Sequence, residues 1–77
     1  MDNMEERLLK IFSEIFTEVD KSEITPDSEF REWEQYSSLT QVELIARIEE
    51  EFKVKVKLLP MVKAETISDV LDAIQES

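Results

Sequence analysis

The sequence predicts an all-α protein: a small four-helix bundle of three longer helices and one short helix. Three stretches place apolar residues three and four positions apart, which is the period of a helix with one buried face. The single stretch with strand-like alternation is short and has no second strand with which to pair. A chain of 77 residues has room for one domain, so residues 1–77 are expected to form a single unit.

The first helix is expected from Met4 to Val19. Asp2 or Asn3 can cap its start, because a short polar side chain accepts a hydrogen bond from the first free backbone N–H groups. Its apolar face is expected to consist of Leu8, Leu9, Ile11, Phe12, Ile15, Phe16 and Val19.

A long connection is expected over residues 20–35. Residues 25–28 read Thr-Pro-Asp-Ser, which is turn chemistry because Pro fixes φ and Asp and Ser bond to their own backbone. Apolar side chains can pin this connection to the bundle, and Trp33 is interpreted as such an anchor rather than as a binding aromatic. The anchors are Ile24, Phe30, Trp33 and Tyr36.

The second helix is expected from Ser38 to Phe52. Glu43 and Arg47 lie four residues apart, a spacing at which they can pair on its outer face. Its buried stripe is expected to consist of Leu39, Val42, Ile45, Ile48 and Phe52, widened by Leu44.

The last third of the chain is expected to hold an extended segment and two helices. Residues 53–58 alternate charged and apolar side chains, and a short helix follows near Pro60 to Ala64. The final helix begins at Thr66, where Asp69 completes a Thr-x-x-Asp capping pattern. Its apolar stripe is Ile67, Val70, Leu71 and Ile74.

Composition excludes several function classes. The chain has no Cys and no His, which removes disulfides, thiolate metal sites and a Ser-His type active site, so no metal site and no catalytic residue are expected. Nineteen acidic residues against nine basic ones give a net charge of -10, which repels nucleic acid and attracts basic protein patches. No apolar run is long enough to span a membrane and no signal peptide is evident, so a cytoplasmic or organelle-matrix protein is expected.

Ser38 is the candidate functional residue because it stands where the long connection meets the second helix. Free backbone N–H groups and the positive end of the helix dipole meet there, and both favour a phosphodiester. Ser38 and Gln41 also spell Ser-x-x-Gln, so a simple capping box is the alternative.

Residues 38–44 and 48–52 together resemble a known family. They read Ser-Leu-Thr-Gln-Val-Glu-Leu and Ile-Glu-Glu-Glu-Phe, similar to the Ser-Leu-x-x-Val-Glu-Leu and Glu-Glu-x-Phe run of acyl carrier proteins. The likeness extends over nearly the whole chain, through Glu5-Glu6-Arg7, Phe30 eight residues before the serine, and Thr66-Ile67.

This resemblance implies that a phosphopantetheinyl transferase esterifies Ser38 with a 4'-phosphopantetheine arm taken from coenzyme A. The arm would carry acyl thioesters between acyl-loading, synthase or acyltransferase enzymes of fatty-acid, lipid or polyketide synthesis, with the carrier acting as a monomer. Glu43, Glu49 and Glu50 match acidic positions that meet basic patches on these partners, or else form only a solvated face. The residues implied to shelter an acyl chain, or to serve as plain core, are Val42, Ile45 and Ile67.

The chain departs from the family pattern at three places. Ser37 replaces the acidic residue before the serine, which the modifying enzyme uses in family members. Lys53, Lys55 and Lys57 bring positive charge to a usually acidic region, and residues 58–62 are unusually apolar. These departures suggest a carrier dedicated to a specialised pathway. The alternatives are an aminoacyl, D-alanyl or peptidyl carrier, and a carrier-like interaction module that lacks the arm.

Overall fold

A computed structural model describes residues 3–75 of the chain. Within this range the backbone forms helices and connecting segments but no strand, which confirms the expected all-α bundle of three longer helices and one short helix. The helices are α1 (Met4–Ile15), α2 (Ser38–Phe52), α3 (Leu58–Lys63) and α4 (Ile67–Gln75), with two single 3₁₀ turns, η1 (Lys21–Glu23) and η2 (Phe30–Glu32), in the long connection.

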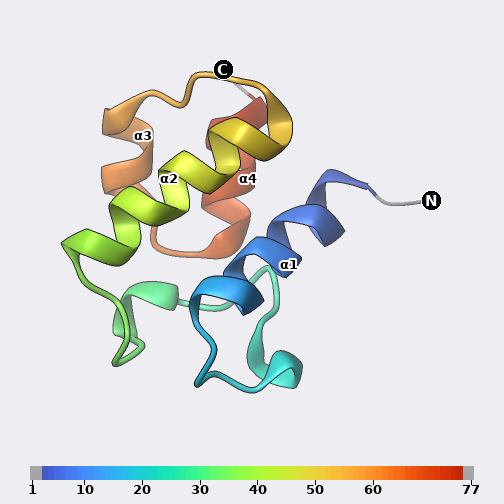
Figure 1. The fold of residues 1–77 in the computed structure, drawn as a ribbon, viewed down its shortest axis with the longest axis vertical. Helices are drawn as coiled ribbons and strands as arrows, with labels where there is room; N and C mark the ends of the chain where they lie inside the picture. Colours follow the sequence, from blue (N-terminus) through green and yellow to red (C-terminus); the bar gives the residue numbers. More distant parts are fainter. Residues whose placement is uncertain (1–2, 76–77) are drawn as a thin grey trace.

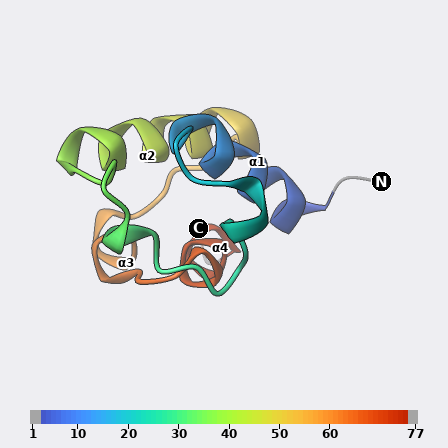
Figure 2. The ribbon, with the colours of Figure 1, turned by 90° about the horizontal axis from the view of Figure 1, so that it is seen from below.

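Helix α1 packs against both α2 and α4, and α3 packs against α4 (Figure 1). The connection from α1 to α2 loops around one end of this arrangement. Figures 1 and 2 both place the start of α2 and the whole of α3 at the same end of the molecule, away from α1 and the N-terminus. That end therefore presents α2 and α3 together.

The core is apolar and draws on every helix and on the connection. Phe30 packs edge-on against Phe12, with ring centroids 5.1 Å apart, and Trp33 packs edge-on against Phe16 at 5.0 Å. These ring contacts confirm Trp33 as an anchor of the connection. The buried residues are Leu8, Ile11, Phe12, Ile15, Phe16, Ile24, Phe30, Leu44, Ile48, Met61, Ala64, Ile67, Val70, Ala73 and Ile74.

The first helix ends at Ile15, so its expected extension to Val19 is wrong. Phe16 leaves helical geometry at φ -96° and ψ 68°, and its N–H still donates to the Phe12 carbonyl at 2.8 Å. Phe16 is nevertheless buried and Val19 is partly buried, because the turn folds back over the same core. Apolar spacing thus continues beyond the helix because of packing, not because of helical backbone.

Helix α2 has the expected bounds, but its expected buried stripe is wrong at the start. Leu39 is 81% exposed and Val42 66% exposed, whereas Leu44 and Ile48 are fully buried. Figure 1 shows the first turns of α2 extending past the end of α1, so α1 does not cover them. Val42 therefore lies outside the core and does not line an interior space with the buried Ile67.

The remaining elements follow the sequence pattern closely. Residues 54–57 form neither helix nor strand, with Lys57 in extended backbone at φ -72° and ψ 136°. Helix α3 begins two residues before Pro60, which lies in its first turn. The Thr66 N–H donates to Asp69 Oδ2 at 3.1 Å and the Asp69 N–H donates to Thr66 Oγ1 at 3.2 Å, which confirms the expected cap of α4. No helix between residues 3 and 75 is long and apolar enough to cross a membrane.

Candidate functional site at the start of α2

Ser37, not Ser38, caps helix α2. Its backbone is extended, at φ -158° and ψ 175°, and its Oγ accepts from the Thr40 N–H at 3.3 Å. In return the Ser37 N–H donates to Thr40 Oγ1 at 2.7 Å, which completes a reciprocal capping box. The alternative capping box between Ser38 and Gln41 is therefore wrong.

Ser38 is the first residue in the helix, and its side chain is exposed. No hydrogen bond within residues 3–75 involves its Oγ, so this hydroxyl points to solvent at the positive end of a 15-residue helix. The first turn of α2 holds no acidic side chain that would repel a phosphate. Exposure, the free hydroxyl and the helix dipole together fit a phosphodiester-linked arm.

The segment before Ser38 is held by the expected anchors Tyr36 and Phe30, and by Arg31, which the sequence did not single out. Tyr36 Oη donates to Gln41 Oε1 at 2.7 Å, and the Tyr36 ring packs edge-on against buried Phe30 with centroids 5.8 Å apart. Arg31 donates from Nη1 to the Val62 carbonyl at 3.1 Å, which ties η2 to α3. These contacts fix the loop from which α2 begins.

The three expected partner-binding acids have different environments. Glu43 and Glu50 are exposed on α2, as expected for residues that meet another protein. Glu49 is only partly exposed, and its Oε2 accepts from the Val56 N–H at 2.9 Å. The structure therefore gives Glu49 a structural contact that neither spacing nor composition indicated.

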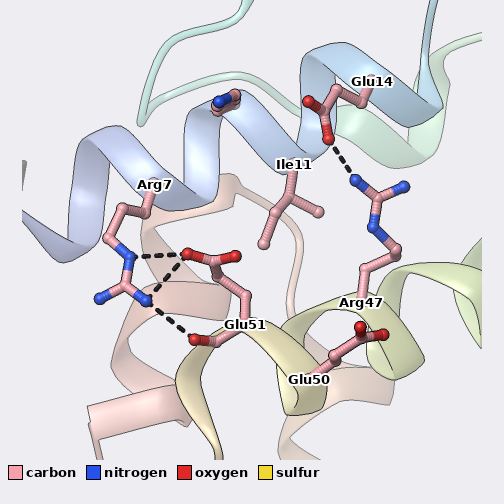
Figure 3. Close-up of a pocket in the computed structure, with 7 residues that line it drawn as sticks. Arg7, Ile11, Glu14, Arg47, Glu50 and Glu51 are labelled. Atoms are coloured by element: carbon pink, nitrogen blue, oxygen red, sulfur yellow. Dashed lines mark hydrogen bonds and ion pairs between the residues drawn. The ribbon is translucent and has the colours of Figure 1, made fainter.

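A polar groove of about 310 Å³ runs between α1 and α2 (Figure 3). Arg7 pairs with Glu51 at 2.8 Å near one end, and Arg47 pairs with Glu14 at the other, with Ile11 between them. Arg47 thus bonds to α1 and not to Glu43, so the expected pair within α2 is wrong. Because two ion pairs cross this groove, it is a contact region that links α1 to α2.

Large apolar side chains are exposed near the start of α2 and on α3. All of those in the described part of the chain belong to these two helices, at the end of the molecule where α2 begins (Figures 1 and 2). They are Leu39, Val42, Leu58, Leu59 and Val62. Exposed apolar groups gathered in this way are typical of a surface that meets other proteins.

A small helical bundle that presents a free serine at the start of a helix, with acidic and apolar residues beside it, has the architecture of a carrier domain. The chain matches the model of the phosphopantetheine attachment site over residues 6–74. It is 35% identical to an acyl carrier protein of Rubrobacter xylanophilus over 74 residues, which cover 92% of this chain and 91% of that protein.

Two further relatives extend the comparison. The acyl carrier proteins of Rickettsia canadensis and Rickettsia rickettsii are each 36% identical over 75 residues, covering 97% of this chain and 86% of theirs. The chain therefore belongs to the acyl carrier protein family, whose members carry acyl groups on a phosphopantetheine arm and are not enzymes. Its resemblance to this family, and the arm as its prosthetic group, are confirmed.

Proposed function

We propose that Ser38 is the residue that carries the arm. One observation carries the proposal: Ser37 Oγ is held by the Thr40 N–H, whereas Ser38 Oγ is exposed and has no hydrogen-bond partner among the described residues. The Ser37 hydroxyl would have to give up its hydrogen bond from the Thr40 N–H, and with it the cap of α2, before it could react. The Ser38 hydroxyl reacts without any change in the helix.

The modification is a phosphoryl-group transfer that the chain cannot catalyse alone. Ser38 Oγ attacks the β-phosphorus of coenzyme A, which carries the pantetheine. The bond between this phosphorus and the oxygen that bridges to the α-phosphate breaks, and adenosine 3',5'-bisphosphate leaves. The serine proton passes to a base on the transferase, because this chain has no His or Cys and no carboxylate in the first turn of α2. A phosphopantetheinyl transferase is therefore the first partner.

We further propose that Glu43, Glu49 and Glu50 bind Arg and Lys patches on partner enzymes. Glu43 and Glu50 have exposed carboxylates, and the exposed Leu39 and Val42 offer apolar contact area near Ser38. Glu49 contributes less, because one of its oxygens already accepts from the Val56 N–H. The partners are acyl-loading, synthase or acyltransferase enzymes of fatty-acid, lipid or polyketide synthesis in the cytoplasm, and the carrier works as a monomer.

Intact mass after co-expression with a broad-specificity phosphopantetheinyl transferase tests the site. The wild-type chain and Ser37→Ala should each gain the mass of one arm, whereas Ser38→Ala should gain nothing. Ser37→Asp, which restores the acidic residue of the family pattern, should be modified faster than the matched neutral variant Ser37→Asn.

Two outcomes would overturn the proposal. Modification that persists in Ser38→Ala would move the arm to another hydroxyl. Absence of any mass gain in the wild type, Ser37→Asp and Ser37→Asn would instead indicate an interaction module that has lost the arm.

A further inference from the structure

The segment after α2 reverses the charge of this protein locally. Residues 53–64 contain four lysines and no acidic residue, whereas the rest of the chain has nineteen acidic residues and five basic ones. The four lysines are all exposed. This stretch, called the lysine segment below, contains Lys53, Lys55, Lys57 and Lys63.

A hydrogen bond holds the lysine segment beside α2. The Val56 N–H donates to Glu49 Oε2 at 2.9 Å, and Val54 and Val56 are partly buried against the core. Lys55 and Lys57 alternate with these two valines along the chain, and both lysines are exposed to solvent. The two lysines therefore flank Val56, which is bonded to Glu49, one of the expected partner-binding residues of α2.

The ammonium groups of Lys55 and Lys57 are available to an approaching protein. Each of the three arginines bonds to another group of the chain: Arg7 to Glu51, Arg31 to the Val62 carbonyl, and Arg47 to Glu14. Within residues 3–75, no hydrogen bond or ion pair engages the side chain of Lys55 or Lys57. Their positive charge is thus not neutralised within the protein.

We propose that Lys55 and Lys57 are specificity determinants that disfavour partner enzymes whose basic patch extends over α2 and the lysine segment together. This inference rests on the proposed function of Ser38 and of the acidic residues of α2. Such a partner is attracted by Glu43 and Glu50 but repelled by the two lysines. A partner with acidic residues opposite the lysines meets no repulsion. The acidic residues of α2 therefore attract partner enzymes, and the two lysines reject those with a basic surface opposite them.

Charge reversal at the two lysines tests the inference with a matched control. The probe is a phosphopantetheinyl transferase with a basic carrier-binding surface, and the readout is kcat/KM for modification of Ser38. The test variant is Lys55→Glu/Lys57→Glu, and the control is Lys10→Glu/Lys21→Glu, in which two exposed lysines of α1 and η1 are reversed. Both double variants carry the same net charge, so only the place of the change differs.

The test variant should raise kcat/KM about three- to tenfold over wild type at about 50 mM NaCl, mainly through a lower KM. The gain should largely disappear at about 500 mM NaCl, where charge interactions are screened. The control should change kcat/KM by less than about twofold under both conditions. The neutral variant Lys55→Ser/Lys57→Ser should fall between wild type and the test variant, and circular dichroism checks that all variants are folded.

Equal gains in the test and control variants would overturn the inference, because net charge alone would then explain them. No gain in the test variant would overturn it as well, while leaving Ser38 as the modified residue. Absence of modification at Ser38 in the wild type and in every variant would overturn the proposed function, and the inference with it.

Discussion

Ser37 and Thr40 hold each other's backbone N–H groups at the start of α2, through Thr40 Oγ1 at 2.7 Å and Ser37 Oγ at 3.3 Å. Ser37→Ala removes one of these acceptors and should lower the free energy of unfolding by about 1 kcal/mol. Ser38→Ala removes no hydrogen bond described in the structure and should change it by less than about 0.5 kcal/mol. Urea denaturation of the unmodified proteins measures both.

The two neighbouring serines therefore have different roles: Ser37 contributes to stability and Ser38 is the proposed site of modification. Ser37→Ala should be less stable yet still gain the arm, and Ser38→Ala should be stable yet gain nothing. A larger loss of stability in Ser38→Ala than in Ser37→Ala would contradict the assignment of the cap.

The sequence predicted those features, such as helix bounds and caps, that depend on residues three or four positions apart. The cap of α4 by Thr66 and Asp69 and the bounds of α2 both follow from short-range spacing, and both are present. The cap of α2 was harder because Ser37 and Ser38 are chemically alike. Only the backbone, which is extended at Ser37 and helical at Ser38, distinguishes them.

Contacts between distant parts of the chain could not be predicted in this way. Arg47 has an acidic residue four positions before it, yet it bonds to Glu14, which is 33 residues away. The exposure of Leu39 likewise depends on α1 not reaching the first turns of α2, which helical periodicity cannot show. Tertiary packing decided both cases.

The two ion pairs between α1 and α2 should differ in their contribution to stability. Arg7 donates to both Glu51 Oε2 and the Glu51 carbonyl, and its guanidinium lies 4.7 Å from the centroid of the Phe52 ring. Among the partners that the structure describes within residues 3–75, Arg47 bonds to Glu14 alone. Because these side chains are more than a third exposed, solvent weakens the charge interaction itself.

Arg7→Ala should therefore lower the free energy of unfolding by about 1–2 kcal/mol, and Arg47→Ala by about 0.5 kcal/mol or less. Urea denaturation at low and high salt measures the difference, and more of the Arg7 contribution should persist at high salt. Equal losses in the two variants would show that the carbonyl and ring contacts of Arg7 add nothing.

The carboxylate of Asp69 should make the stability of the bundle depend on pH. The N–H groups of Glu65 and Thr66 both donate to Asp69 Oδ2 at 3.1 Å, and these bonds hold the pKa of Asp69 below its ordinary value of 3.8. A carboxyl whose pKa is lower in the folded state favours folding when it is ionised. This contribution is present above the unfolded-state pKa and disappears as pH falls through the folded-state pKa.

Asp69→Asn should thus be less stable than wild type at about pH 6, and the difference should shrink as the pH falls from about 4 toward 2. Thermal unfolding of both proteins across this range is the measurement. Asp72→Asn is the matched control on the same helix, because Asp72 is exposed and accepts no described hydrogen bond. A difference between Asp69→Asn and wild type that stays constant with pH would contradict the role of the ionised carboxylate.

Lys53 ends α2 in the left-handed region, at φ 56° and ψ 45°. Glycine is favoured at this position because a Cβ atom crowds the backbone there, and this chain contains no glycine. Lys53→Gly should therefore raise the free energy of unfolding by about 0.5–1 kcal/mol. Lys55→Gly removes the same charge at a residue that does not have a positive φ. Glycine relieves no crowding there and adds freedom to the unfolded chain, so this variant should lower stability by several tenths of a kcal/mol. Chemical denaturation compares the two variants, which have equal net charge. Stabilisation of both would show that loss of a lysine charge, and not relief of backbone crowding at Lys53, is the cause.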